Sequence, residues 1–242
     1  SGNSDIPFMG EVSGFTQSED GAIWVASEAT GVLRIDPITN QIAPYGQMPL
    51  DEKRLTSGRL YRIITDSTGH IWVASEKSGV MRINPISRQI QNFVHSGEDT
   101  RSLSSNQTSD IFEDSSGDIW IATAEGLNLF AAETEDFVRF GTHNTDLPDD
   151  FIISIYQTRE GKYWVGTRSG LASGMRTQFQ LFDRERNNLS NNSVNAFTET
   201  PDGTLWVGTD DGLNKLPTDS TEFRWINEST QPYLSSAIVM SL

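Results

Sequence analysis

Short apolar runs centred on a tryptophan recur along the chain and dominate its pattern of hydrophobic and polar positions. Each run reads Ile, Tyr or Leu, then Trp, then Val or Ile, then Ala or Gly, and the five runs cover residues 23–26, 71–74, 119–122, 163–166 and 205–208. A strand with one face in solvent alternates apolar and polar residues, whereas these runs are apolar on both faces. They therefore predict strands that are covered from both sides.

The frame around these tryptophans repeats. Their spacings are 48, 48, 44 and 42 residues, and every tryptophan has a glycine three positions before it. A second glycine, followed by Val or Leu, comes a few residues after each tryptophan, at Gly31, Gly79, Gly126, Gly170 and Gly212. Self-similarity at periods of about 40–50 residues is the signature of a repeat architecture.

Each repeat predicts four short strands, here called A to D. In the second repeat these are residues 60–65, 71–75, 80–84 and 89–94. The A–B connection, at 66–69, is rich in residues that tolerate a positive φ. The C–D connection contains Asn84-Pro85, and proline begins a turn but does not serve a central ladder. The fourth repeat lacks such a proline turn, so its outer strands are the weakest part of the pattern.

Four-stranded antiparallel units covered on both faces by their neighbours make a β-propeller, and we predict this all-β fold as a single domain over 1–242. The predicted blades are 11–49, 58–95, 106–141, 151–183 and 193–227. Residues 235–242 repeat the approach to strand A at 103–105 and 189–191, and so predict the first strand of a sixth blade. The chain is therefore expected to be part of a larger propeller.

Residues 111–128 and 199–215 carry the sequences IFEDSSGDIWIATAEGLN and ETPDGTLWVGTDDGLNK. These segments, with the Leu-Ser-Ser and Leu-Ser-Asn lead-ins at 103 and 189, resemble the two-component regulator propeller repeat. The resemblance implies an extracytoplasmic, periplasmic sensor domain of a bacterial membrane receptor. It also implies that a separate hybrid histidine kinase or cyclic-dinucleotide (GGDEF or EAL type) domain gives the output, and that the ligand is a small molecule such as a saccharide.

The composition of the chain argues against several other classes of protein. Among 242 residues there are 18 Lys and Arg against 33 Asp and Glu, a formal net charge of −15. Nucleic acids and anionic lipid surfaces bind proteins through clustered Lys and Arg side chains, so neither is an expected partner of this acidic chain. The chain has no cysteine, which excludes thiol nucleophiles and Cys-ligated metals. No catalytic motif or metal-ligand spacing is present, so we expect no enzyme activity, cofactor or metal in this segment, and no apolar run approaches the ~20 residues of a membrane helix.

The B–C loops are the candidate ligand-binding residues, because the frame around them is constant while their charges vary. In a propeller these loops lie on the same face as the D–A loops and surround the channel. The candidates are Glu28, Glu76, Lys77, Glu125, Arg168, Asp210 and Asp211. The tryptophans of the frame are instead expected to be core residues, and Trp225, outside it, is the one expected nearest to solvent.

Two alternatives from other classes remain open. The Gly-x-x-Trp frame, and Val32-Leu33-Arg34-Ile35 after the second glycine, are similar to the repeat of streptogramin B lyases, which implies an enzyme with a magnesium site. A protein-interaction scaffold would give a stable partner and no small-molecule response. For an open, partial propeller a homodimer, or association through open propeller edges, is expected, because unpaired edges and apolar blade faces favour pairing.

Overall fold

The computed structural model describes residues 11–27, 31–45, 59–175, 178–226 and 238–240. These residues form five separate four-stranded antiparallel sheets, which we call blades one to five. Blade one contains β1 (Val12–Gln17), β2 (Ile23–Ser27), β3 (Gly31–Ile35) and β4 (Ile42–Tyr45). Blade two contains β5 (Leu60–Thr65), β6 (Ile71–Ser75), β7 (Val80–Ile83) and β8 (Ile90–Phe93). Blade three contains β9 (Thr108–Glu113), β10 (Ile119–Thr123), β11 (Gly126–Ala131) and β12 (Asp136–Phe140).

The remaining two blades keep the same order. Blade four contains β13 (Ile152–Gln157), β14 (Tyr163–Thr167), β15 (Gly170–Met175) and β16 (Gln178–Phe182). Blade five contains β17 (Val194–Glu199), β18 (Leu205–Thr209), β19 (Gly212–Leu216) and β20 (Arg224–Ile226). A one-turn helix, α1 (Arg184–Asn187), follows blade four. Within the described ranges no helix is long and apolar enough to cross a membrane.

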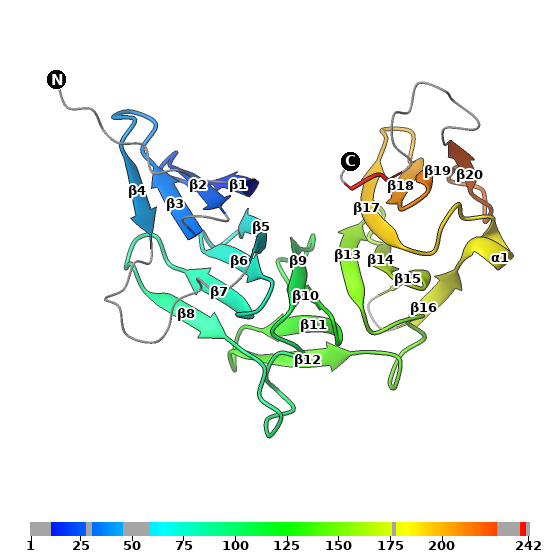
Figure 1. Ribbon diagram of the computed structural model, residues 1–242, viewed down its shortest axis with the longest axis horizontal. Helices are drawn as coiled ribbons and strands as arrows, with labels where there is room; N and C mark the ends of the chain where they lie inside the picture. Colours follow the sequence, from blue (N-terminus) through cyan, green and yellow to red (C-terminus); the bar gives the residue numbers. More distant parts are fainter. Residues whose placement is uncertain (1–10, 28–30, 46–58, 176–177, 227–237, 241–242) are drawn as a thin grey trace.

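The blades lie side by side along an open arc (Figure 1). The first strand of each blade is at the inside of the arc, and the last strand is at its outer rim. This is the radial arrangement of a β-propeller, so the predicted fold class and the five repeats are confirmed. Blade four forms all four strands although it lacks the proline turn, with Leu171 paired to Phe182 and Ala172 to Leu181.

Each hydrophobic cluster is shared by two consecutive blades. Trp24 packs with Ile63 and Ile83 of the next blade, and Trp72 packs with Ile119 and Phe130. The four frame tryptophans of blades one to four are buried: Trp24, Trp72, Trp120 and Trp164. These four are core residues, as the sequence predicts, whereas the fifth, Trp206 of blade five, is only partly buried. Trp225 is 36% exposed, which agrees with its position outside the frame.

The second glycine of the frame is required where the B–C loop enters strand C. Gly79 has a φ of 70°, and a Cβ placed there would lie 2.1 Å from the carbonyl oxygen of Phe93. Gly126 has a φ of 124°, with the corresponding distance to Phe140 equal to 2.7 Å. Only glycine combines a positive φ with such a close approach of the outer strand.

Polar contacts add to the packing between blades on the face that carries the A–B and C–D turns, here called the turn face. The last residue of an inner strand accepts a backbone N–H from the A–B turn of the preceding blade. Glu113 accepts from Ser67 N (2.8 Å), Gln157 Oε1 from Ser115 N (2.9 Å), and Glu199 from Arg159 N (3.0 Å). We call these contacts the inter-blade clasps.

Residues 238–240 lie against blade five. The backbone N–H of Val239 donates to the Thr209 carbonyl (3.0 Å), and a Cβ on Gly208 would lie 2.8 Å from Val239 Cγ1. Val194, the first residue of β17, has the same relation to Gly166 of blade four, at 2.7 Å. Val239 therefore occupies the place of a first strand residue of a following blade. The rest of the predicted strand, 235–237 and 241–242, lies outside the described residues, as do 28–30, 46–49, 58, 176–177 and 227 of the predicted blades.

Candidate functional site

The predicted site residues lie at the end of the blades opposite the turn face, which we call the loop face. Glu28 lies outside the described residues. The other six follow the second strand of their blades, where four are exposed (Lys77, Glu125, Arg168 and Asp210) and two are partly buried (Glu76 and Asp211). Within the described ranges, no hydrogen bond or ion pair joins any of the six to another. The structure therefore places them on one face without assembling them into a single cluster.

Each of three B–C loops is fixed by one backbone hydrogen bond to the residue that precedes the inner strand of its own blade. Glu76 N donates to Arg59 O (2.8 Å), Ala124 N to Gln107 O (3.0 Å) and Asp210 N to Ser193 O (3.2 Å). The Asn195 amide also donates to Asp210 Oδ1 (2.9 Å). The loop backbones are thus held in place, while the side chains at their tips remain free to differ.

Arg168 is ordered by stacking. Its Cζ lies 3.4 Å from the centroid of the Phe151 ring, a cation–π contact from the lead-in of the same blade. The neighbouring Ser169 donates its hydroxyl to Asp149 Oδ2 (2.6 Å). A guanidinium stacked on a ring keeps its N–H edges available for hydrogen bonds, so Arg168 can present a fixed donor array to a ligand.

An unforeseen acidic group lies on an inner strand. Asp110 of β9 is 17% exposed in its side chain, and its Oδ1 lies 3.4 Å from Nε of Arg62 in blade two. Its Oδ2 accepts the backbone N–H of Ile155 in blade four (3.2 Å). The carboxylate therefore joins three consecutive blades, and burial raises its pKa to about 6 although Arg62 opposes this.

The sequence contained a signal for Asp110 that the repeat frame obscured. The third residue of the inner strand is different in every blade: Gly14, Arg62, Asp110, Ser154 and Ala196. Residues of opposite charge stand at this position in two adjacent blades, Arg62 in blade two and Asp110 in blade three. Alignment of the inner strands by register, in addition to the tryptophan strands, would have paired Arg62 with Asp110.

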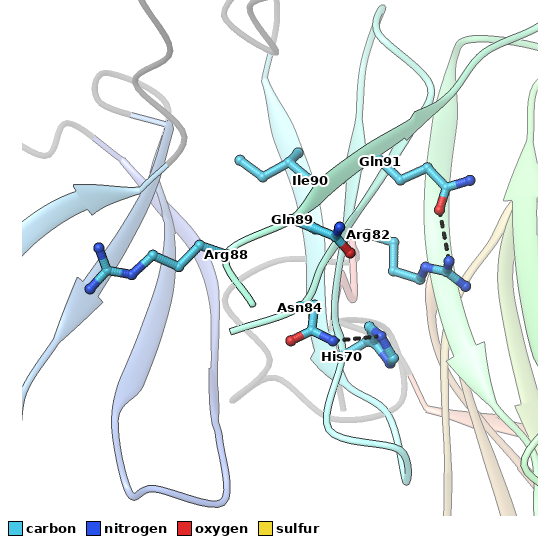
Figure 2. A pocket seen from close by; sticks show the side chains of 7 residues that line it. All are labelled: His70, Arg82, Asn84, Arg88, Gln89, Ile90 and Gln91. Atoms are coloured by element: carbon cyan, nitrogen blue, oxygen red, sulfur yellow. Dashed lines mark hydrogen bonds between the residues drawn. The ribbon is translucent and has the colours of Figure 1, made fainter. Parts of the chain in front are cut away.

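A pocket lies on the turn face of blade two, away from the predicted loops. Its volume is about 490 Å³. It is lined by His70, Arg82, Asn84, Arg88, Gln89, Ile90 and Gln91. Figure 2 shows that these side chains come from the A–B turn, the C–D turn and the two outer strands of one blade. We call this cavity the blade-two pocket.

Possible metal ligands are dispersed. Over the described ranges, no three His, Asp or Glu side chains are grouped so that they could hold a metal ion. His95, which follows β8, instead fixes its loop, with Nδ1 at 2.8 Å from the Leu103 carbonyl oxygen.

Comparisons with known proteins separate the fold from the function. The sequence pattern of the two-component regulator propeller matches residues 102–125, 146–169 and 188–211, the lead-ins and first two strands of blades three to five. No curated protein sequence matches the chain. The extracellular domain of the putative hybrid two-component system BT4673 from B. thetaiotaomicron is similar in structure, with a TM-score of 0.71 at 22% identity.

The coverage of these structures is unequal. The alignment with BT4673 covers 90% of this chain and 31% of that one, so this chain spans about a third of its length. For the extracellular domain of BT3049, also from B. thetaiotaomicron, the TM-score is 0.55 at 20% identity, with 94% of this chain and 36% of that one covered. Virginiamycin B lyase from Staphylococcus aureus has a TM-score of 0.66 at 16% identity, with 90% and 70% covered.

The structural likenesses, all below 25% identity, establish the propeller fold. The three matched segments fall on the same elements of successive blades, and the same tryptophan and glycine frame extends through blades one and two. Blades three to five of this chain each match the two-component regulator propeller repeat.

Proposed function

We propose that this chain is a non-enzymatic, ligand-sensing propeller of a bacterial signalling receptor. It lies in the periplasm, binds a small molecule such as a saccharide at the loop face, and passes the signal to an output domain elsewhere in the parent protein. The family repeat supports this, as do the BT4673 and BT3049 structures, which are described as extracellular domains of putative hybrid two-component systems.

One observation carries the choice of the loop face. The order of the strands and the glycines of the frame are constant from blade to blade, and three of the B–C loops are fixed by the same backbone hydrogen bond, yet the exposed loop side chains change from Lys77 to Glu125 to Arg168 to Asp210. A constant scaffold with varied polar side chains at one mouth is how repeat folds build a recognition site.

A ligand screen with a matched pair of variants tests the site. Saccharides and other small molecules are screened by thermal shift, and each hit is titrated by calorimetry against the wild type. We expect the triple variant Lys77→Ala, Arg168→Ala, Asp210→Ala to weaken binding at least about tenfold, because each lost hydrogen bond to a charged group is worth roughly 1.5–3 kcal/mol. A control removes three charges from the turn face: Glu19→Ala, Arg159→Ala, Glu160→Ala. Unchanged affinity in the loop variant, with its circular dichroism intact, would exclude the loop face.

The lyase alternative has a specific observation in its favour, since virginiamycin B lyase shares the fold over most of its length. It requires a divalent metal, so EDTA discriminates the two. Ligand binding that is unaffected by EDTA and leaves the ligand intact by mass spectrometry favours the sensor. Magnesium-dependent turnover of a bound ligand favours the enzyme.

The proposal includes self-association through the free face of blade one. Phe15 on β1 is 74% exposed, whereas its equivalents Ile63 and Ile111 are 4% and 0% exposed because the preceding blade covers them. A second copy of the chain, which offers blade surfaces of the same kind, is the partner that fits this face.

A further inference from the structure

The blade-two pocket includes one cross-strand pair of side chains that the other described blades do not carry. Arg82 faces Gln91 across the two outer strands. The pairs at the same register in the other blades are Arg34–Ala43, Leu129–Val138, Ser173–Gln180 and Lys215–Arg224. Of these five described pairs, the Arg82–Gln91 pair has a hydrogen bond between its side chains, 2.7 Å from Nη2 to Oε1. The repeat alone does not account for this arrangement.

The wall of the pocket formed by Arg82 and Gln91 is hydrogen-bonded to blade three and carries no net charge. Glu135 of blade three accepts a hydrogen bond from Arg82 and another from the Gln91 amide, the latter at 3.0 Å. These two hydrogen bonds and the positive charge of Arg82 hold the pKa of Glu135 below its usual value, so the carboxylate is ionised and balances the guanidinium. The Arg82 Cζ also lies within 5.6 Å of the Trp72 ring centroid, which fixes its plane.

The floor of the pocket is equally ordered. The Asn84 amide donates to Nε2 of His70 (3.4 Å), and Nδ1 of His70 lies 2.8 Å from the Thr68 hydroxyl. In Figure 2 the Gln89 amide lies between this floor and Arg82, whereas Arg88 extends away from the other side chains toward the sheet of blade one. Among the described residues no anionic side chain is paired with Arg88, and the Arg88 guanidinium lies outside the pocket.

From this geometry we propose that the blade-two pocket binds a neutral polyhydroxylated molecule, of the size of a monosaccharide. Planar carboxamide, guanidinium and imidazole groups present donors and acceptors side by side, which match pairs of adjacent hydroxyl groups. The volume of about 490 Å³ lies within the range of small-molecule sites. Because Glu135 cancels the charge of Arg82, a carboxylate-bearing ligand gains no ion pair and is repelled by the acidic molecule. This site is independent of the loop face.

The test is an NMR titration of the isotopically labelled full chain with methyl glucoside, and with glucuronate as the anionic counterpart. We expect side-chain amide signals of Asn84, Gln89 and Gln91 to shift with the neutral sugar. Gln89→Ala is expected to weaken its binding about fivefold, the loss of roughly one hydrogen bond. Gln41→Ala is the matched control, because Gln41 is the exposed residue at the same place in the C–D turn of blade one.

A charge variant distinguishes a recognition site from a merely structural network. Glu135→Gln keeps a partner for Arg82 but removes the balancing charge, so we expect glucuronate to bind at least as tightly as methyl glucoside in this variant. Two results would overturn the proposal: no shift of these amides with the neutral sugar, or tighter binding of glucuronate than of methyl glucoside by the wild type. Loss of loop-face binding in the triple variant above leaves this result unaffected.

Discussion

At the scale of single residues, the protonation of Asp110 makes the free energy of unfolding depend on pH. Its pKa in the folded chain is about 6, above the ordinary value of 3.8, because burial disfavours the charged form. Above pH 6 the folded state therefore holds a costly charge. As the pH falls from 6 toward 4, the folded state takes up the proton before the unfolded state does, and the free energy of unfolding rises.

We therefore expect Asp110→Asn to lose this pH dependence. The gain in free energy of unfolding between pH 7 and pH 5, measured by urea denaturation, should be about 1–2 kcal/mol larger in the wild type than in the variant. The amide oxygen of Asn still accepts from Ile155 N, so the variant should fold. Identical pH profiles for the two chains would contradict the assignment.

Another residue-scale expectation comes from the tryptophan indoles. Trp72 Nε1 donates to Asp66 (2.6 Å) and Trp120 Nε1 to Asp114 (2.9 Å). In blade five the equivalent residue is Thr200, and Nε1 of Trp206 is buried with no partner among the described residues. An unmet buried donor costs about 1–3 kcal/mol.

The double variant Thr200→Asp, Asp202→Ser gives blade five the residues that blade three has at the first and third positions of this turn, Asp114 and Ser116. We expect it to supply the missing acceptor and to raise the free energy of unfolding by about 1 kcal/mol, seen as a higher Tm in calorimetry. The single change Asp202→Ser serves as the control, because it alters the turn without adding the acceptor. A double variant no more stable than this control would contradict the expectation.

The residue scale also shows what the sequence could and could not predict. The positions of the core tryptophans and of the positive-φ glycines follow from the repeat, because every blade imposes the same packing and the same close approach. The residues at the positions of Asp110 and Glu135 differ from blade to blade. Asp110 contacts both neighbouring blades, and Glu135 accepts a hydrogen bond from Gln91 of the preceding blade. Such contacts depend on how blades are placed side by side, which a repeat pattern does not encode.

At the scale of strands and blades, the inter-blade clasps can be measured separately from the turns. Gln157 and Gln17 are equivalent and both donate to a glycine carbonyl in their own turn, at 3.3 Å and 3.2 Å. Gln157 additionally accepts Ser115 N of the preceding blade. We expect Gln157→Ala to destabilise the chain by about 1 kcal/mol more than Gln17→Ala, measured by chemical denaturation. Equal effects would show that the clasp contributes nothing.

Strand boundaries at this scale were predictable where the pattern is apolar and less so at the rim. The central strand β6 begins and ends where the sequence predicts, whereas the outer strand β8 is shorter at both ends than 89–94. Outer strands have one neighbour and more solvent, so their ends are set by turn geometry more than by hydrophobic pattern. The blade-two pocket is formed by such rim residues, which explains why the sequence did not indicate it.

At the scale of the whole molecule, the proposed self-association through blade one can be tested at its exposed residue Phe15. We expect Phe15→Ser to weaken self-association about tenfold or more, because burial of a phenylalanine contributes roughly 2 kcal/mol. Ile38→Ser is the control, since Ile38 is 89% exposed on the same blade but at the tip of a turn. Sedimentation velocity over a range of concentrations gives the comparison, and equal shifts for both variants would exclude a specific role for the blade face.

The fixation of the B–C loops also bears on how such a chain evolves. Because one backbone hydrogen bond and one glycine hold the B–C loops of blades two, three and five, the few residues between them contribute little to the folding free energy. Substitutions in the B–C loops are therefore expected to change stability little and to be tolerated. Substitutions in the tryptophan frame are expected to destabilise the chain and to be removed by selection. Lineages that share this frame should therefore diverge in ligand preference by changes of two or three residues per blade, without passing through unfolded intermediates.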